Sequence, residues 1–191
     1  MRYEPEQKTR THQRIVRNAA RKLRAEGLKG SGVASIMKAS GLTVGGFYKH
    51  FQSKDELFTE AITQGFSEFN DHLKSSLQDV PPEDWWKEIV RWYLSPEHCN
   101  HPETGCPVAA LSADITRAKI TVRRRIAELL TEQNAHLATF MPGATDEVRK
   151  QNATVIFGSM AGALAMARIF TDPADRQKIL QNTRDFLLRG F

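Results

Sequence analysis

Apolar residues recur at steps of three and four residues along most of this 191-residue chain, and no stretch alternates with a period of two for long enough to form a convincing β-strand. The clearest case follows Ser53, where one helix face carries Leu57, Phe58, Ala61, Ile62, Phe66, Phe69, Leu73 and Leu77. Such a helix extends about 37 Å, enough to reach from one small domain into another. The pattern therefore predicts an all-α fold.

Capping and breaking residues predict where the helices begin and end. Ser53 followed by Glu56 is a capping box, and Gly27 is expected to end a first helix that starts at Thr9. The same reasoning predicts further helices over residues 33–40, 44–51, 82–94, 107–117, 121–141, 145–170 and 173–189. Ser95–Gly105, which contains two prolines, is expected to be one long loop.

The positive charge of the chain is concentrated at its N-terminal end. The formal net charge is +5, yet residues 1–60 hold 12 Lys and Arg side chains against 6 Asp and Glu, whereas the remaining residues hold 15 against 16. This distribution indicates a small basic module joined to an electrically neutral one. An anionic partner such as nucleic acid is expected for the basic module.

Val33–Phe51 has the pattern of a helix-turn-helix. Gly41 can adopt the left-handed conformation that ends the first helix, and the Thr43 hydroxyl is expected to cap the second. Phe47 and Phe51 share one face and should be buried, which leaves Val44, Gly45, Tyr48 and Lys49 facing outward. Two consecutive glycines at the start of a helix cost about 1 kcal/mol each relative to alanine, and they would permit close approach to a duplex.

The segment Gly41–Leu57, GLTVGGFYKHFQSKDEL, resembles the recognition-helix signature of the tetracycline-repressor (TetR) family of bacterial transcription regulators. The preceding VASIMKAS of Val33–Ser40 also fits, and the resemblance covers roughly residues 8–60. It implies a DNA-binding domain of three helices over residues 1–54. It further implies a C-terminal bundle of about six helices over residues 55–191, which binds an inducer and forms a homodimer through its last two helices.

The same resemblance assigns contacts to individual residues. It places Thr43, Tyr48, His50 and Lys54 on phosphates and Val44 and Gly45 nearest the bases. The outward-facing Lys49 is a further candidate for DNA contact. Val44 departs from the polar residue that relatives often carry there, and it could contact a thymine methyl group. Lys8 and Arg10 on the first helix could add backbone contacts.

The resemblance implies a ligand-responsive transcriptional regulator, a repressor that a small-molecule inducer releases from a palindromic operator of double-stranded DNA. A cytoplasmic location is expected, because the first fourteen residues are mostly polar or charged and the chain has only two cysteines. The uncharged stretch Ala153–Ala167 is shorter than the ~18–20 residues that span a bilayer. Its Gly158 and Gly162 suit a closely packed helix pair.

Several aromatic side chains and one cysteine are candidates for the inducer pocket, although aromatic residues at helical spacing more often belong simply to a core. They are Phe66, Phe69, Trp86, Trp92, Tyr93, Cys106 and Phe157. A thiol-based sensor of oxidants or electrophiles is an alternative of the same fold, because Cys106 opens a helix whose dipole should lower the thiol pKa.

Other functional classes have weaker support. His98, Cys99, His101 and Cys106 could hold zinc, but their spacing matches no established motif, and no metal or other cofactor is expected. Arg123–Arg125 could bind phosphate or form a solvated helix face. The sequence lacks a Gly-rich phosphate loop after a strand, a Gly-x-Ser-x-Gly elbow and a His-Glu-x-x-His motif, so no catalytic residue is assigned. A ligand-carrying helical protein or an enzyme remains the alternative of another class.

Overall fold

The computed structural model describes residues 5–191, which form helices and no strands, as the apolar periodicity predicted. Arg2 and Glu4, which belong to the predicted basic module, lie outside the described residues. The α-helices of the described part are α1 (Pro5–Gly30), α2 (Val33–Ala39), α3 (Lys54–Ser76), α4 (Trp85–Tyr93), α5 (Pro96–Asn100), α6 (Pro107–Arg117), α7 (Ile120–Ala138), α8 (Asp146–Ala167) and α9 (Pro173–Gly190). Short 3₁₀-helices lie between them at η1 (Val44–Lys49), η2 (Pro82–Asp84) and η3 (Pro102–Thr104).

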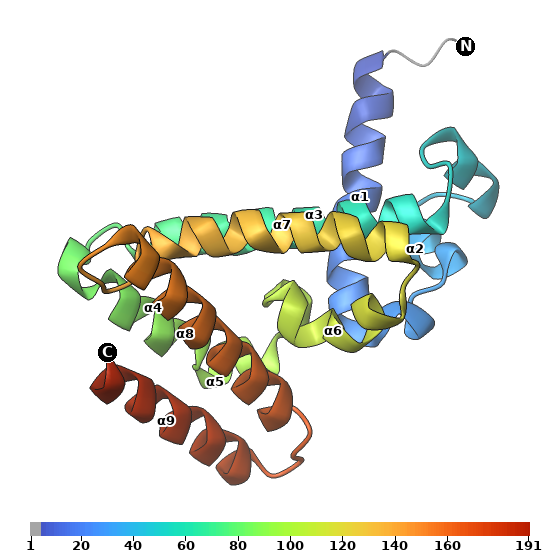
Figure 1. Cartoon of the computed structure of the whole chain (residues 1–191). Helices are drawn as coiled ribbons and strands as arrows, with labels where there is room; N and C mark the ends of the chain where they lie inside the picture. Colours follow the sequence, from blue (N-terminus) through green and yellow to red (C-terminus); the bar gives the residue numbers. More distant parts are fainter. Residues whose placement is uncertain (1–4) are drawn as a thin grey trace.

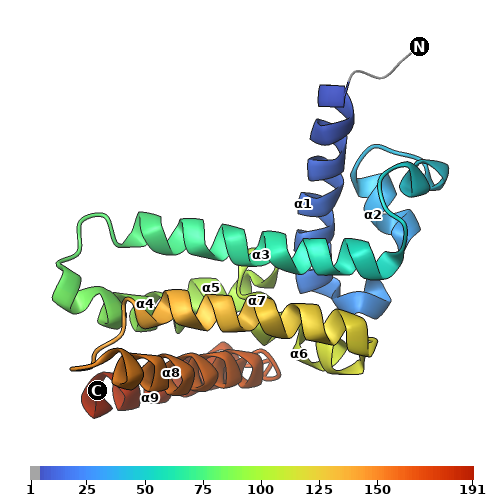
Figure 2. The same cartoon turned by 45° about the horizontal axis from the view of Figure 1, so that its top comes forward.

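The long helices α3 and α7 lie side by side and form the middle of the molecule (Figures 1 and 2). Between them, Asn70 and Gln133 exchange two side-chain hydrogen bonds of 3.0 and 2.8 Å. Helix α1 crosses α3, and its N-terminal half projects beyond the bundle beside α2 and η1, whereas α8 and α9 pack on each other at the opposite side.

Two hydrophobic cores meet along α3. The first joins α1, α2, η1 and the first half of α3, and it includes Leu111 of α6 and Ile126 of α7. The second joins the later half of α3 to α4, α8 and α9, with Tyr93 and Ile156 fully buried. Helix α1, which packs on α2, therefore also packs on α6, and α3 packs on both α6 and α7.

The prediction of one long loop over Ser95–Gly105 is wrong, because α5 and η3 occupy most of it. The Ser95 hydroxyl caps α5 by accepting a hydrogen bond from the His98 N–H (3.1 Å). Each of the two prolines occupies the first position of its helix, where its missing N–H costs nothing. The prolines start helices here rather than interrupt them.

Helix α1 continues past the predicted stop, and Gly27 marks a break within it. Gly27 has the positive φ of 72° expected of a helix-ending glycine, but a further turn follows it. The N–H of Leu28 in this turn donates to the Asp114 carboxylate of α6 (3.2 Å). The end of α1 is thereby attached to the C-terminal bundle.

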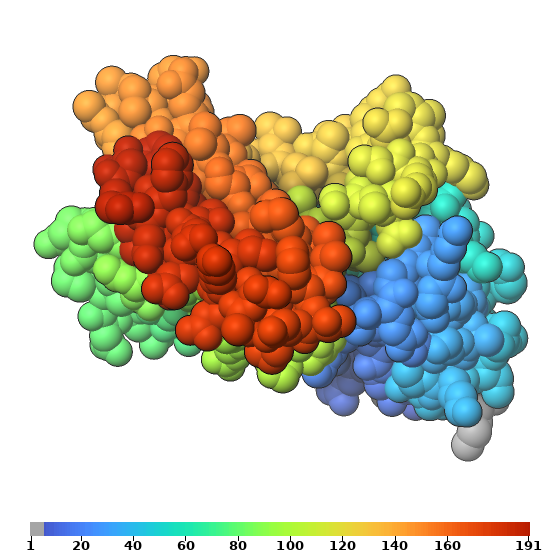
Figure 3. All heavy atoms as spheres, turned by 90° about the horizontal axis from the view of Figure 1, so that it is seen from below, coloured from blue at the N-terminus to red at the C-terminus, as the bar shows by residue number. Residues whose placement is uncertain are grey.

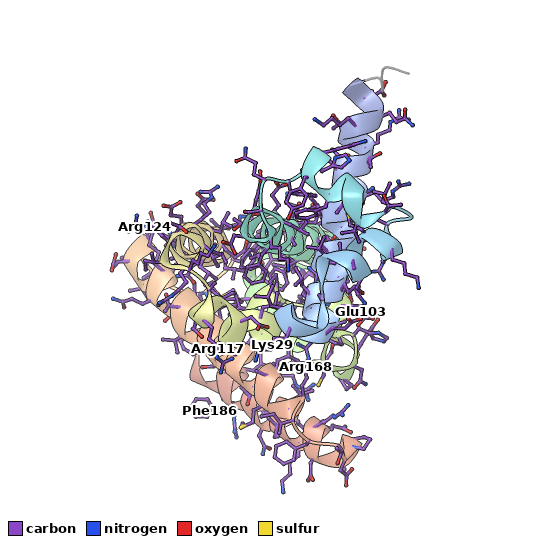
Figure 4. The ribbon with its side chains drawn as sticks, turned by 90° about the vertical axis from the view of Figure 1, so that its right-hand side faces the viewer. Lys29, Glu103, Arg117, Arg124, Arg168 and Phe186 are labelled. Atoms are coloured by element: carbon purple, nitrogen blue, oxygen red, sulfur yellow. The ribbon has the colours of Figure 1, made fainter. Side chains whose placement is uncertain are left out.

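One face of α8 is buried and the other is exposed. Gly158 and Gly162 lie on the exposed face, and a Cβ atom at either position would meet no atom within 4 Å. Large apolar residues of α8, of α9 and of the segment between them are exposed nearby, namely Val155, Met166, Ile169, Phe170 and Phe186. Phe186 points away from the body of the protein in Figure 4, and α9 covers much of the face seen in Figure 3. Within residues 5–191, no helix combines the length and apolar character needed to cross a bilayer.

Candidate nucleic-acid interface

The turn between α2 and η1 is fixed by its own backbone. Gly41 has φ 68°, which confirms the predicted left-handed residue. The Leu42 N–H donates to the Met37 carbonyl (2.9 Å) and the Gly41 N–H to the Lys38 carbonyl (3.0 Å), the two bonds of a Schellman ending. The Asn18 side chain of α1 donates to the Ser40 hydroxyl (3.1 Å), so the turn is also held from outside.

The second helix of the motif differs from the expected α-helix, because Val44–Lys49 forms a 3₁₀-helix. The poor α-helix propensity of Gly45 and Gly46 is a sufficient physical reason. The predicted cap by the Thr43 hydroxyl is wrong: no side chain caps this helix, and the Gly46 N–H donates instead to the Thr43 backbone carbonyl (3.0 Å). The Thr43 side chain is exposed and available to a partner.

The inner and outer faces of η1 are as predicted. Phe47 and Phe51 are buried and stack with their ring centroids 5.4 Å apart. On the outer face, Val44, Gly45, Tyr48 and Lys49 are exposed, Tyr48 by 78%. Because no described side chain covers these residues, the outer face of η1 is free to enter a groove of DNA.

A basic groove of about 770 Å³ separates η1 from the projecting half of α1. It is lined by Gln7, Lys8, Arg10, Thr11, Arg14, Leu42, Thr43, Gly46, Lys49 and His50. These residues include four Lys or Arg and no carboxylate, although Arg10 forms an exposed ion pair with Glu6 (2.7 Å). The sequence analysis singled out Lys8 and Arg10 but missed Arg14, which recurs at helical spacing on the same side of α1.

His50 borders this groove as a neutral side chain. Its pKa is lowered first by burial and then by electrostatic interaction with His12, Lys8 and Lys49. His12 itself contacts the Glu60 carboxylate (2.6 Å) and stacks on Phe51. The His50 Nδ1 atom is buried without a hydrogen-bond partner, which leaves the other ring nitrogen as the one that could contact a phosphate.

The start of α3 presents a capped N-terminus next to η1. The Ser53 hydroxyl accepts from the Glu56 N–H (3.1 Å), which confirms the cap, whereas the Glu56 carboxylate accepts from the Gln52 N–H (2.5 Å) rather than from Ser53. Lys54 is exposed at the first position of the helix. Its charge adds to the N-terminal dipole, a combination that favours a phosphate.

The pocket candidates lie on two sides of α3. Phe66 is buried in the first core, whereas Phe69, Trp86, Tyr93 and Cys106 are buried in the second, with Trp92 and Phe157 packed against it. Phe157 also lines an apolar groove of about 440 Å³, together with Gly158, Ala161, Gly162 and Leu130. The structure thus brings six of the seven candidates together, and their contact with a ligand stays a prediction.

His98 and Cys106 form a buried pair in the second core. The His98 Nδ1–H donates to the Tyr93 carbonyl (2.8 Å), and the His98 Nε2 accepts from the Cys106 backbone N–H (3.0 Å). Because both ring nitrogens are engaged with the backbone, His98 has none left for zinc. Within residues 5–191, no group of three or more His, Cys, Asp and Glu side chains is arranged to hold a metal ion.

The Cys106 thiol lacks the lowered pKa that its position at the start of a helix predicted. Burial raises its pKa, although the Tyr93 hydroxyl and the first N–H groups of α6 act in the opposite direction. The expected lowering by the helix dipole is therefore overcome by loss of solvent. Cys99 is also buried, so neither thiol is exposed to a reagent in this conformation.

Acid should destabilise the protein through His98. Burial lowers its pKa from 6.5 to about 4, so the unfolded chain binds a proton first as the pH falls. The free energy of unfolding has its full value above about pH 6.5 and is lower by about 3 kcal/mol at pH 4, because each unit of pKa difference corresponds to 1.36 kcal/mol. His98→Gln, which removes the titratable ring and keeps one donor and one acceptor, should show a smaller decline in urea unfolding between these pH values. An equal decline in the variant would contradict this assignment.

Comparisons with known proteins place these features in a family. Residues 15–61 match the family described as bacterial regulatory proteins, tetR family. The chain is 23% identical over 186 residues to an uncharacterized HTH-type transcriptional regulator in the lacX 3′ region of Lactococcus lactis subsp. lactis, an alignment that covers 95% of this chain and 93% of that protein.

Solved structures share the fold of the whole chain. A TetR transcriptional regulator from Chloroflexus aurantiacus J-10-FL superposes with a TM-score of 0.76 at 20% identity, covering 96% of this chain and 97% of that one. The transcriptional regulator FadR from Bacillus subtilis, solved in complex with stearoyl-CoA, superposes with a TM-score of 0.70 at 15% identity, covering 94% and 99%.

Proposed function

Because this chain belongs to the TetR family of bacterial transcription regulators, we propose that it is a ligand-responsive repressor. It binds a palindromic operator as a homodimer and leaves it when a small molecule occupies the C-terminal bundle. The observation that carries this proposal is the exposed outer face of η1 beside a groove with four basic side chains and no carboxylate.

In this proposal η1 enters the major groove, and the residues around it hold the backbone. Val44 and Gly45 are nearest the bases, and Lys49 lies beside them. Thr43, Tyr48, His50 and Lys54 contact phosphates, and the cations of α1 neutralise further phosphates. With one apolar residue and one glycine at the bases, phosphate contacts and DNA shape supply much of the binding energy.

The exposed apolar face of α8 and α9 supports dimerisation. Ile169 and Phe186 are 77% and 69% exposed, and Gly158 and Gly162 leave room for a second helix to approach closely. Two copies of this face related by a two-fold axis would bury these residues against each other. The same axis would place two η1 segments on the two halves of a palindrome.

Contacts between the two parts of the chain supply a route for release. Arg24 of α1 is almost fully buried, donating to the Glu68 carboxylate of α3 (2.5 Å) and to the Glu103 carbonyl of η3 (2.9 Å). Lys119, just before α7, pairs with Asp55 at the start of α3 (2.7 Å). A ligand that favours a different position of η3 or α6 therefore favours a different position of α1 and α3, and with them a different spacing of the η1 segments.

Tyr48→Ala and Lys54→Ala should each weaken binding to all DNA sequences by roughly 10- to 100-fold. Lys54→Ala should also reduce the slope of log Kd against log salt by about 0.9 for each half-site, whereas loss of the neutral Tyr48 should leave the slope unchanged. Fluorescence anisotropy with labelled duplexes at several salt concentrations measures both quantities. Lys74→Ala, which removes an exposed charge at the far end of α3, is the control. Unchanged affinity in both variants would exclude the proposed interface.

The function itself is tested with the DNA upstream of the chain's own coding region. In a gel shift at physiological salt, the protein should retard this DNA when it is labelled. An excess of the same duplex without label should abolish the retardation, whereas a random duplex of equal length should not. A ligand-carrying protein or an enzyme of the same fold would give no such specificity. Retardation that the random duplex abolishes equally well would contradict the proposal.

A further inference from the structure

We propose that the cavity at the junction of α1 with α8 and α9 binds a compact anion, a phosphate or a carboxylate, and that this anion is an effector of the protein. The cavity measures about 440 Å³, within the range of small-molecule sites. It is lined by Arg24, Ala25, Cys99, Asn100, Pro102, Ala109, Ala110, Ala165, Arg168 and Arg176. Three arginines and no carboxylate line it, and the effector role rests on the proposed function.

Arg168 is the central residue of this site. Its Nε donates to the Cys99 carbonyl (3.1 Å) and its Nη2 to the His98 carbonyl (2.8 Å), while its Nη1 is buried and has no hydrogen-bond partner. No Asp or Glu of the described residues forms an ion pair with it. Glu103, on the neighbouring segment (Figure 4), directs its carboxylate to His101 (3.2 Å).

A half-buried guanidinium without an ion-pair partner is costly. Burial lowers the pKa of Arg168, which means that the folded protein disfavours its charge. An unpartnered donor that is removed from water loses its hydration without replacement. A bound anion would supply the missing negative charge.

Arg176 and Arg24 complete the surroundings of the cavity. Arg176 donates from Nε to the Phe170 carbonyl (2.6 Å) and from Nη1 to the Asn100 side chain (3.2 Å), and it too lacks a carboxylate partner among the described residues. Arg24 forms the wall on the side of α1, and its charge is balanced by Glu68. The uncompensated charge therefore belongs to Arg168 and Arg176, on the side of the C-terminal bundle.

The position of the cavity connects binding to DNA affinity. One wall is α1, which carries the cations of the basic groove, and the opposite wall is α8 and α9. An anion held by Arg168 and Arg176 would lie next to Ala25, so we expect its binding to favour one position of α1 over another. Differential affinity for two positions of α1 is the required condition for regulation.

Direct binding measurements test the site in the full-length protein at constant ionic strength. Inorganic phosphate and succinate serve as separate probes of the two anion chemistries, with chloride as the balancing salt. At least one probe should bind saturably and raise the unfolding midpoint by about 5 °C at 100 times its Kd. Arg176→Gln should weaken this binding at least about 10-fold, the effect of removing one charge-assisted hydrogen bond.

Two control variants separate this site from other sources of anion binding. Arg184→Gln removes another charge from α9 without touching the cavity and should leave binding unchanged. Lys49→Ala removes a cation of the basic groove and should also leave it unchanged. Binding that is lost with Lys49→Ala but kept in Arg176→Gln would assign the anion to the DNA interface and overturn the proposal, as would failure of both probes to bind.

The effector role has its own readout. Operator affinity of the unmodified protein should fall at least about 10-fold at saturating anion, and Arg176→Gln should bind operator normally without responding to the anion. Unaltered operator affinity at saturation would overturn the regulatory role. Because anion binding is measured without DNA, failure of the site and failure of the proposed function give different results.

Discussion

Replacing Lys8, Arg14 and Lys49 together with alanine should abolish specific operator binding, with a loss of affinity on the order of 10³- to 10⁵-fold at 0.1 M salt. These three cations line one groove between α1 and η1 that contains no carboxylate. A dimer would lose six phosphate contacts, each worth about 0.9 in the slope of log Kd against log salt, so the slope should fall by about 5. Anisotropy titrations at several salt concentrations give both numbers.

The matched control for this variant is alanine at Arg123, Arg124 and Arg125. All three are exposed on α7, and Arg124 points into solvent in Figure 4. The control removes the same charge, so a general loss of electrostatic attraction would affect both variants alike. The assignment of the groove fails if the two triple variants lose affinity to the same extent. The control should retain operator binding within about 10-fold, because none of the three removed side chains lines the basic groove.

The helix-turn-helix was predictable because short-range signals determine it. The left-handed Gly41, the inward Phe47 and Phe51 and the cap at Ser53 act within a few residues of themselves, and each is found as expected. The wrong prediction that the Thr43 hydroxyl caps η1 also has a local cause. Two neighbouring glycines lower helix propensity enough to favour a 3₁₀-helix, and its geometry uses the Thr43 carbonyl instead of the hydroxyl.

Contacts between distant segments could not be predicted from spacing. In the sequence, Arg24 is one of several cations on an amphipathic helix. In the structure its side chain is buried against α3, next to Gly65. A Cβ at Gly65 would lie 2.4 Å from the Arg24 Nη1, so the absence of a side chain there creates the space. Nothing near either residue in the sequence indicates that they meet.

The cavities illustrate the same limit. Aromatic residues at helical spacing correctly indicated side chains of the core, although Trp92 and Phe157 are only partly buried, but a cavity forms where side chains are small. The groove beside Phe157 is bordered by Gly158, Ala161 and Gly162, and the cavity beside Arg168 is bordered by alanines of α6 and α8. Its charge comes from Arg168, which reads in the sequence only as the residue that ends an apolar stretch.

Substituting both Gly158 and Gly162 with lysine should convert a dimer into monomers without harming the folded protomer. A Cβ at either position meets no atom within 4 Å, so the protomer accommodates the new side chains. Replacing glycine within a helix also favours folding by up to about 1 kcal/mol per site. A partner helix packed on this face would in contrast be pushed away by two long charged side chains.

Sedimentation and thermal unfolding separate these two effects. The variant should sediment as a monomer at concentrations at which the unmodified protein is expected to be a dimer, with a dimer Kd raised at least about 10²-fold. Its far-ultraviolet spectrum should remain that of the unmodified protein. Lysines at the exposed Ser67 and Ser75 of α3 are the matched control, since they add the same charge to a face that is not part of the proposed interface.

Operator binding links the oligomeric state to function. If two copies joined through α8 and α9 place one η1 segment on each half-site, the lysine variant should lose at least about 10²-fold in affinity for a palindromic duplex, while its weak binding to a single half-site stays unchanged. The difference arises because joining two modules makes the second contact intramolecular. Retention of a dimer by the variant would place the interface on another face of the molecule, and the exposed Ile169 and Phe186 would then require a different partner.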